Sequence, residues 1–292
     1  MLMLFVLVAA ALLVVARMLL DRRDLGLALF PARLGPAGND RLDSPLALAI
    51  RLQRGPLIGW VVGFIAFGAI MGSIAASAAD LLDSNPQLQD VLAKLGGAGA
   101  LTDIFLAAIG SLGGLAVGGY AISAALRMSS EESADRLGPV LAGSVARTRW
   151  MSGHLLFVLL GPVLVLGAAG LVAGLSHGAR IGDVGGGLES TLSAMLVQAP
   201  AALVMGGIAV ALFGWLPRWT SLAWAALVIA LLLGQLGALL QLPQALMNLS
   251  PYTHVPPVPA EPINWLSTVV LLAVAAGLMV AGLLGFRHRD VN

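Results

Sequence analysis

The chain has 292 residues, of which 59% are hydrophobic and 11% charged, with a mean hydropathy of +0.93. This composition excludes disorder and argues against a soluble globular fold, because too little polar surface remains to face water. A net charge of +1 gives no global field that would attract nucleic acid, and none is expected as a partner. The absence of cysteine excludes disulfides, thiolate catalysis and cysteine-ligated metals.

Long apolar segments recur along the chain, and each is close to the roughly 20 residues that a membrane-spanning helix requires. We place seven of them, at 2–19, 57–78, 101–126, 151–175, 191–215, 220–241 and 264–286. A helix keeps its backbone hydrogen bonds internal, which the hydrocarbon core demands. We therefore predict an all-α polytopic membrane protein with seven transmembrane helices.

The basic residues set the expected orientation of these spans. With seven spans, fourteen of the sixteen Lys and Arg residues fall on one face of the membrane, and only Lys94 and Arg180 fall on the other. Cytoplasmic loops carry such an excess of positive charge. We therefore expect the N-terminus outside the cytoplasmic membrane and the C-terminus in the cytoplasm.

Two short amphipathic helices are expected beside the spans. Residues 44–54 have Ser44 as an N-cap and Pro45 at the first helical position, and Gly55 with Pro56 should end the helix on the cytoplasmic membrane surface. Residues 85–97 should form a second such helix outside.

The loop at 127–150 contains the most unusual non-spanning sequence. Ser129 and Glu132 have the spacing of a capping box, and Leu137, Val140 and Leu141 form a small apolar patch among charged residues. The segment is either a solvated connector or a docking element for a cytoplasmic partner, because a small apolar patch rimmed by charge suits a groove.

Several motifs that would carry chemistry are missing. A phosphate-binding loop needs a Lys after Gly, but the only Lys is Lys94, which follows Ala93. The four His residues lie far apart in sequence, without the spacing of a metal site. The span interiors contain almost no ionisable residues, which argues against a proton-driven pump. We expect a pathway for an apolar cargo whose energy comes from elsewhere.

Glycines are arranged for close helix contact. Gly110, Gly114 and Gly118 form two consecutive GxxxG steps, and the pairs Gly68–Gly72 and Gly170–Gly174 form two more. Small residues at this spacing let helices approach closely. Packing within the chain is the simpler interpretation, and a gliding or dimerising face is the alternative.

Three motifs resemble the actinobacterial ABC type-2 permeases of the polyketide-antibiotic and multidrug exporter group. SSEESADRLGPVLAGSVARTRWMSGH (residues 129–154) is similar to the cytoplasmic loop of that group, SPLALAIRLQRGPLIGW (residues 44–60) to its elbow helix, and LSPYTHVPPVP (residues 249–259) to its last external loop. The resemblance runs from about Asp21 to the end of the chain. Members of the group are usually about twice as long, so this chain resembles their C-terminal half.

The resemblance implies a division into a leading helix with its linker at 1–43 and a six-helix permease unit at 44–292. It implies that the loop at 127–150 couples the permease to cytoplasmic ABC ATPase subunits, which would hold the ATP and Mg, while this chain itself binds no cofactor. The coupling residues would be Glu131, Glu132, Arg136, Leu137, Val140, Leu141 and Arg147.

A second permease half, as another chain or a second copy, is also implied, with a hydrophobic, polyketide-like or drug-like compound as the exported cargo. Two other classes stay open. An ATP-independent secondary transporter would need charge within the spans, and a lipid-acting membrane enzyme would need converging acidic or His side chains at one interface.

Overall fold

The computed structural model describes residues 13–14, 17–18, 44–83, 98–143, 145–237 and 240–289. The chain divides into two units, Met1–Leu42 and Asp43–Asn292, and the long helices of the described part belong to the second. Most of the predicted first span at 2–19, the linker after it and the predicted helix at 85–97 lie outside the described residues.

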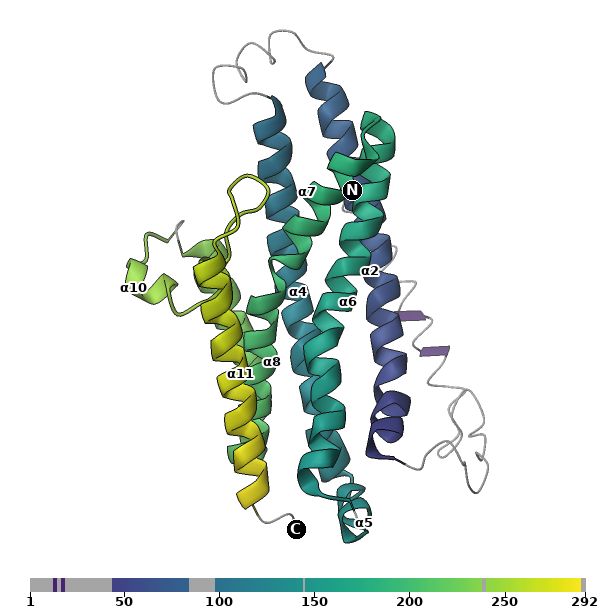
Figure 1. Ribbon diagram of the computed structural model, residues 1–292, viewed down its shortest axis with the longest axis vertical. Coiled ribbons are helices and arrows are strands. Elements are labelled where there is room, and N and C mark those ends of the chain that lie inside the picture. The colour runs from purple at the N-terminus through teal and green to yellow at the C-terminus, as the bar shows by residue number, and fades with distance from the viewer. Residues whose placement is uncertain are drawn as a thin grey trace. The chain divides into compact units, whose positions relative to one another are not determined.

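The described part of the second unit consists of helices, turns and loops (Figure 1). Its α-helices are α2 (Pro45–Asp83), α4 (Ala98–Ser133), α5 (Leu137–Ala142), α6 (Arg147–Ile181), α7 (Val184–Leu196), α8 (Ala199–Trp215), α9 (Leu222–Leu231), α10 (Gln244–Met247) and α11 (Trp265–His288). Three short elements complete it: the 3-10 turns η1 (Pro217–Trp219) and η3 (Pro251–His254), and the π-helical turn η2 (Leu232–Leu236).

Five segments among the described residues are long and apolar enough to cross a membrane, and they confirm the all-helical membrane fold. They are Pro45–Ala75, Thr102–Ser133, Arg147–Ile181, Val184–Trp215 and Trp265–His288. The fourth consists of α7 and α8 and is interrupted at Val197 and Gln198. These segments contain the spans predicted at 57–78, 101–126, 151–175, 191–215 and 264–286, apart from the ends of three of them.

The segment predicted to span at 220–241 is shorter in the structure. Its helix begins at Leu222, changes to a π turn at Leu232 and ends at Leu236. Gly234 and Gly237 lower helix stability there, and the side chain of Gln235 turns aside to donate a hydrogen bond to Ser111 at 2.9 Å. The helix falls short of the length of a full span, so the count of seven spans stays a prediction.

The predicted break at Gly55 and Pro56 is wrong. Helix α2 is continuous from Pro45 to Asp83 with Pro56 inside it, although the hydroxyl of Ser44 does cap its start by accepting from the backbone N–H of Ala47 at 3.2 Å. Packing against α6 offsets the hydrogen bond that a proline removes from a helix. The first turns lie so close to α6 that a Cβ added at Gly153 would stand 3.3 Å from the Cβ of Ala49.

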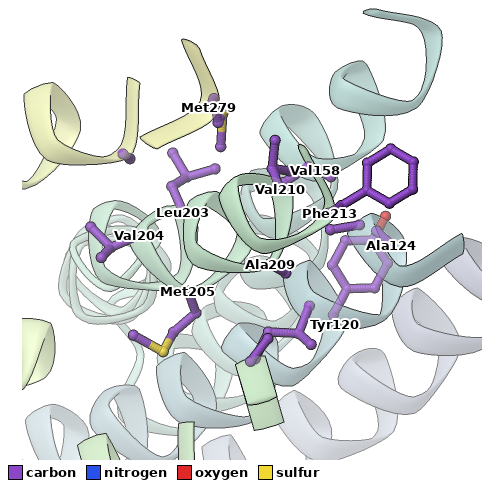
Figure 2. Packing of buried hydrophobic residues seen from close by; sticks show 14 of the residues in the cluster. Tyr120, Ala124, Val158, Leu203, Val204, Met205, Ala209, Val210, Phe213 and Met279 are labelled. Carbon is purple, nitrogen blue, oxygen red and sulfur yellow. The ribbon is translucent and has the colours of Figure 1, made fainter. Parts of the chain in front are cut away.

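Helix α8 forms the centre of the unit, and most of its residues are buried. Figure 2 shows its side chains surrounded by Met279 of α11, Val158 of α6, and Tyr120 and Ala124 of α4.

The predicted packing glycines of α4 all face other parts of the same chain. A Cβ on Gly110 would collide with the carbonyl oxygen of Ala194 in α7, and one on Gly114 would lie 2.6 Å from the side chain of Gln198. A Cβ on Gly118 would collide with the hydroxyl of Tyr252. These three glycines thus bring α4 against α7, the α7–α8 break and the loop before α11.

The predicted glycine pairs on α2 and α6 also face neighbouring helices. Gly68 and Gly72 lie against the backbone of α6, and Gly170 and Gly174 lie against α7. The glycines with open space are others: a Cβ on Gly55, Gly59 or Gly63 would meet no atom within 4 Å. Close packing within the chain therefore accounts for the predicted pairs, while an open glycine face lies on α2.

Candidate coupling site at one end of the bundle

The last turn of helix α4 carries the acidic pair Glu131 and Glu132 of the 127–150 segment. The carboxylate of Glu131 is buried and is paired with Arg127 at 2.9 Å and with Arg136 at 3.5 Å. Burial of a charge is tolerated only when it is paired in this way. Glu131 therefore holds together the end of α4 and the turn after it.

The capping box predicted at Ser129 and Glu132 is wrong. Both residues lie inside α4, and the hydroxyl of Ser129 pairs with that of Thr220 at 3.3 Å. The helix continues to Ser133 because the core continues along it: Met128 in this stretch is fully buried. Asp135 then ends the helix in the left-handed region at φ 54°, which Asp tolerates better than most residues do.

Arg289, just after α11, is the centre of the site, and the sequence interpretation did not include it. Its guanidinium binds both carboxylate oxygens of Glu132, at 2.6 and 2.7 Å, and donates to the carbonyl of Phe213 at 3.2 Å. The same group lies over the rings of Phe213 and Phe286, with centroids 5.1 and 5.5 Å away. Both bonds to Glu132 come from Nη2 while Nη1 reaches Phe213, and the planar guanidinium leaves its face free to stack on the two rings.

Arg147 at the start of α6 joins the same network by donating to the backbone carbonyl of Arg289. Glu132, Arg147 and Arg289 therefore connect the ends of α4, α8 and α11 with the start of α6. Of the predicted coupling residues, Glu131 and Arg136 belong to one ion-paired group with Arg127, while Glu132 and Arg147 both bind Arg289.

The apolar patch of α5 faces inward. Leu137 is buried in the core, and Val140 and Leu141 are half-buried and pack against the same core. Leu137 thus supports the loop, and its side chain is not available to a partner. The exposed surface of α5 consists instead of Gly138, Pro139 and Ala142, and Figure 1 shows α5 at the end of the bundle where α11 ends.

A layer of aromatic and polar side chains lies directly behind the charges. Trp150 is buried with its ring 5.7 Å from that of Phe286 and 4.8 Å from that of His154. Gln53 of α2 donates to the carbonyl of Ala124 at 3.0 Å, and its amide lies 3.3 Å from Nδ1 of His154. The start of α2 is therefore tied to α4 and α6 at the same end of the unit.

Among the residues that the structure describes, no three His, Asp or Glu side chains gather closely enough to hold a metal ion. The site can pair charges and transmit a displacement between helices.

Comparison with known proteins gives two matches. Residues 42–287 match a family described as the C-terminal domain of the multidrug efflux system permease Rv1217c. The chain is also 38% identical over 285 residues to the multidrug efflux system permease protein Rv1217c of Mycobacterium tuberculosis. The alignment covers 97% of this chain and 52% of that protein, so the chain spans about half the length of the curated relative that it matches.

Proposed function

The chain belongs to the family of the multidrug efflux permease Rv1217c C-terminal domain, and from that premise we propose that it is the membrane subunit of an ATP-driven exporter. A separate cytoplasmic ATPase would supply the energy, and the cargo would be hydrophobic, polyketide-like or drug-like compounds. The observation that carries the proposal is the ionic network around Glu132 and Arg289, which makes the 127–150 segment one unit with the ends of α4, α8 and α11.

The network suits a device that moves helices together. A partner that pushes on the exposed face of α5 would move α4 and α6 through the buried side chain of Leu137. It would move α8 and α11 through the contacts of Arg289. Packed helices respond to such a push by rigid-body shifts, because close-packed interiors do not deform continuously. ATP-driven closure of the partner would therefore open the pathway between the spans.

A second permease half is part of the proposal. The relative is about twice as long as the alignment, and the open face of α2 at Gly55, Gly59 and Gly63 offers a surface where another helix can approach closely. Beside it, Trp60, Phe64 and Phe67 of α2 face α4 across an apolar groove of about 550 Å³. The second half would cover this face, either as another chain or as a second copy.

The orientation completes the proposal. The end that carries α5 and Arg289 would lie in the cytoplasm, in agreement with the Arg-rich segments around it, and the 240–264 loop would lie outside.

Transport into inverted membrane vesicles tests the energy source. Vesicles that contain this chain, its ATPase and the second half should accumulate a fluorescent hydrophobic drug when ATP is added, and vanadate should stop the accumulation. Dissipating the proton gradient should leave the rate unchanged. Drug accumulation that is insensitive to vanadate and depends on the proton gradient would instead identify the protein as a secondary transporter.

A further inference from the structure

A second site lies part-way along the bundle from α5, beside the middle of α8. Helices α8, α9 and α11 and the loop at 248–254 enclose a cavity of about 530 Å³. It is lined mainly by aliphatic side chains, with three polar side chains contributed by Asn248, His254 and Ser267. Small-molecule sites have this size and this composition of apolar walls with a few polar groups.

The cavity exists because α9 and α11 both pack against α8 but scarcely contact each other. Met205, Ala230 and Leu271 form its buried wall, one from each of the three helices. Leu249 and Leu266, which are 73% and 75% exposed, stand at its mouth. The cavity therefore opens outward between α9 and α11 and is not a sealed packing defect.

The polar groups offer defined hydrogen-bonding positions. Nε2 of His254 lies 2.9 Å from the carbonyl oxygen of Asn248, which can only accept, so Nε2 donates to it and Nδ1 is the ring nitrogen left for a ligand. The Oδ1 of Asn248 accepts from Gln244 at 3.0 Å, and its amide N–H groups remain donors. Ser267 adds a hydroxyl that can serve in either role.

The loop that carries these groups is held rigidly by buried hydrogen bonds. Ser250 donates to the carbonyl of Ala230 in α9 at 3.0 Å, and the hydroxyl of Tyr252 reaches the carbonyl of Gly114 in α4 at 3.1 Å. Both side chains are buried. A ligand would thus meet groups that are already in position, which lowers the entropic cost of binding.

We propose that this cavity binds an amphipathic drug-like compound. The apolar body of the compound would fill the space between α8, α9 and α11, while a hydroxyl or amine at one end would meet His254, Asn248 and Ser267. The inference rests on the proposed function, and it assigns to the exporter a cargo site next to the outer loop. A compound of this kind fits better than a phospholipid, because the lining contains no Lys or Arg to pair with a phosphate.

The absence of cysteine from the chain makes a direct test possible. Val270→Cys puts one thiol in the cavity, and Val163→Cys puts a control thiol on α6; the two valines are 51% and 43% exposed. The full chain would be placed in phosphatidylcholine nanodiscs and labelled with a maleimide. The probe is daunorubicin, which has an apolar ring system and an end with hydroxyl and amine groups.

Daunorubicin should slow labelling at position 270 saturably, by about threefold or more, and should leave labelling at position 163 unchanged. His254→Leu should raise the half-protecting concentration about three- to tenfold, the effect of one lost neutral hydrogen bond. Protection at neither position, or equal protection at both, would overturn the site. Lipid in the cavity would give a different pattern at position 270: slow labelling in nanodiscs without drug, fast labelling in detergent, and no effect of daunorubicin. That result would also overturn the proposal.

The same samples separate this inference from the proposed function. Protection at position 270 requires no ATP, whereas the exporter assignment requires that daunorubicin stimulate the ATPase of the assembled complex. Protection of position 270 without stimulation of the ATPase would support the site and contradict ATP-driven export. Stimulation of the ATPase without protection of position 270 would support ATP-driven export and contradict the site.

Discussion

Arg289 has more partners than any other charged side chain at the α5 end of the described structure. It combines a bidentate ion pair with Glu132, a hydrogen bond to Phe213 and contact with two aromatic rings. The pair is mostly buried, with 14% and 19% of the two side chains exposed, so solvent screens it only partly. Stability and coupling should both depend on this residue.

Arg289→Ala should lower the free energy of unfolding by about 1–3 kcal/mol, because it leaves the Glu132 carboxylate without its partner. Arg287→Ala, at an exposed position of the last turn of α11, is the matched control and should change little. Unfolding in detergent, followed by tryptophan fluorescence, measures both variants. Combining Glu132→Ala with Arg289→Ala should cost clearly less than the sum of the single losses, and strict additivity would argue against the pair.

Tyr252 should make stability depend on alkaline pH. Burial raises the pKa of its hydroxyl above the ordinary value of about 10. Above about pH 10 the folded chain therefore keeps a proton that the unfolded chain releases. The contribution is fully present below about pH 10 and is lost as the pH rises further. Unfolding measured between pH 9 and pH 11 should show a steeper loss in the native chain than in Tyr252→Phe, and parallel curves would contradict the assignment.

Among the elements, α2 contains two kinds of glycine that should respond differently to substitution. Gly68→Leu should prevent stable folding, because its Cβ would enter the backbone of Ala169, whereas Gly59→Leu has open space. Gly59→Leu should therefore yield a folded chain that associates more weakly with the second permease half. Size-exclusion chromatography of the two variants, alone and co-expressed with the second half, measures both effects; full association of Gly59→Leu would exclude this face as the contact.

Apolar length alone predicted the five membrane-capable helices well, since a long apolar run in lipid has few alternatives to a helix. It predicted their interruptions poorly. Proline at position 56 and the serine-to-glutamate spacing at 129–132 are local signals, and packing of Gln53 and Met128 outweighed both of them. A helix-breaking or capping signal does not end a helix where buried contacts continue on both sides of it.

The candidate site was only partly visible in the sequence for a similar reason. The acidic pair and Arg147 were singled out through the resemblance of the loop to a permease family, but Arg289 lies far along the chain from Glu132 and looks like an ordinary basic residue after a span. Its spacing of three residues after Phe286 was the available signal, because side chains three apart on a helix are neighbours and a cation there can stack on the ring. The inward direction of Leu137 depends on how α4 ends at Asp135, which the sequence pattern does not specify.

At the scale of the whole molecule, two separate regions lie along α8 and α11. The charged end of the bundle connects α4, α6, α8 and α11 through Glu132 and Arg289, and the cavity between α8, α9 and α11 lies beside the middle of α8. Helices α8 and α11 reach both regions, so a displacement at the charged end would reach the cavity walls along them. The outward face of α5 is where that displacement would begin.

The central claim is that a partner ATPase acts on this outward face, and Gly138 tests it most directly. Gly138→Trp adds bulk where a Cβ meets no atom within 4 Å, and Gly277→Trp adds the same bulk at an equally open position on α11. In the reconstituted complex, drug-stimulated ATP hydrolysis should fall to the unstimulated rate in Gly138→Trp and persist in Gly277→Trp, with both variants inserted equally. Full stimulation of Gly138→Trp would contradict the claim.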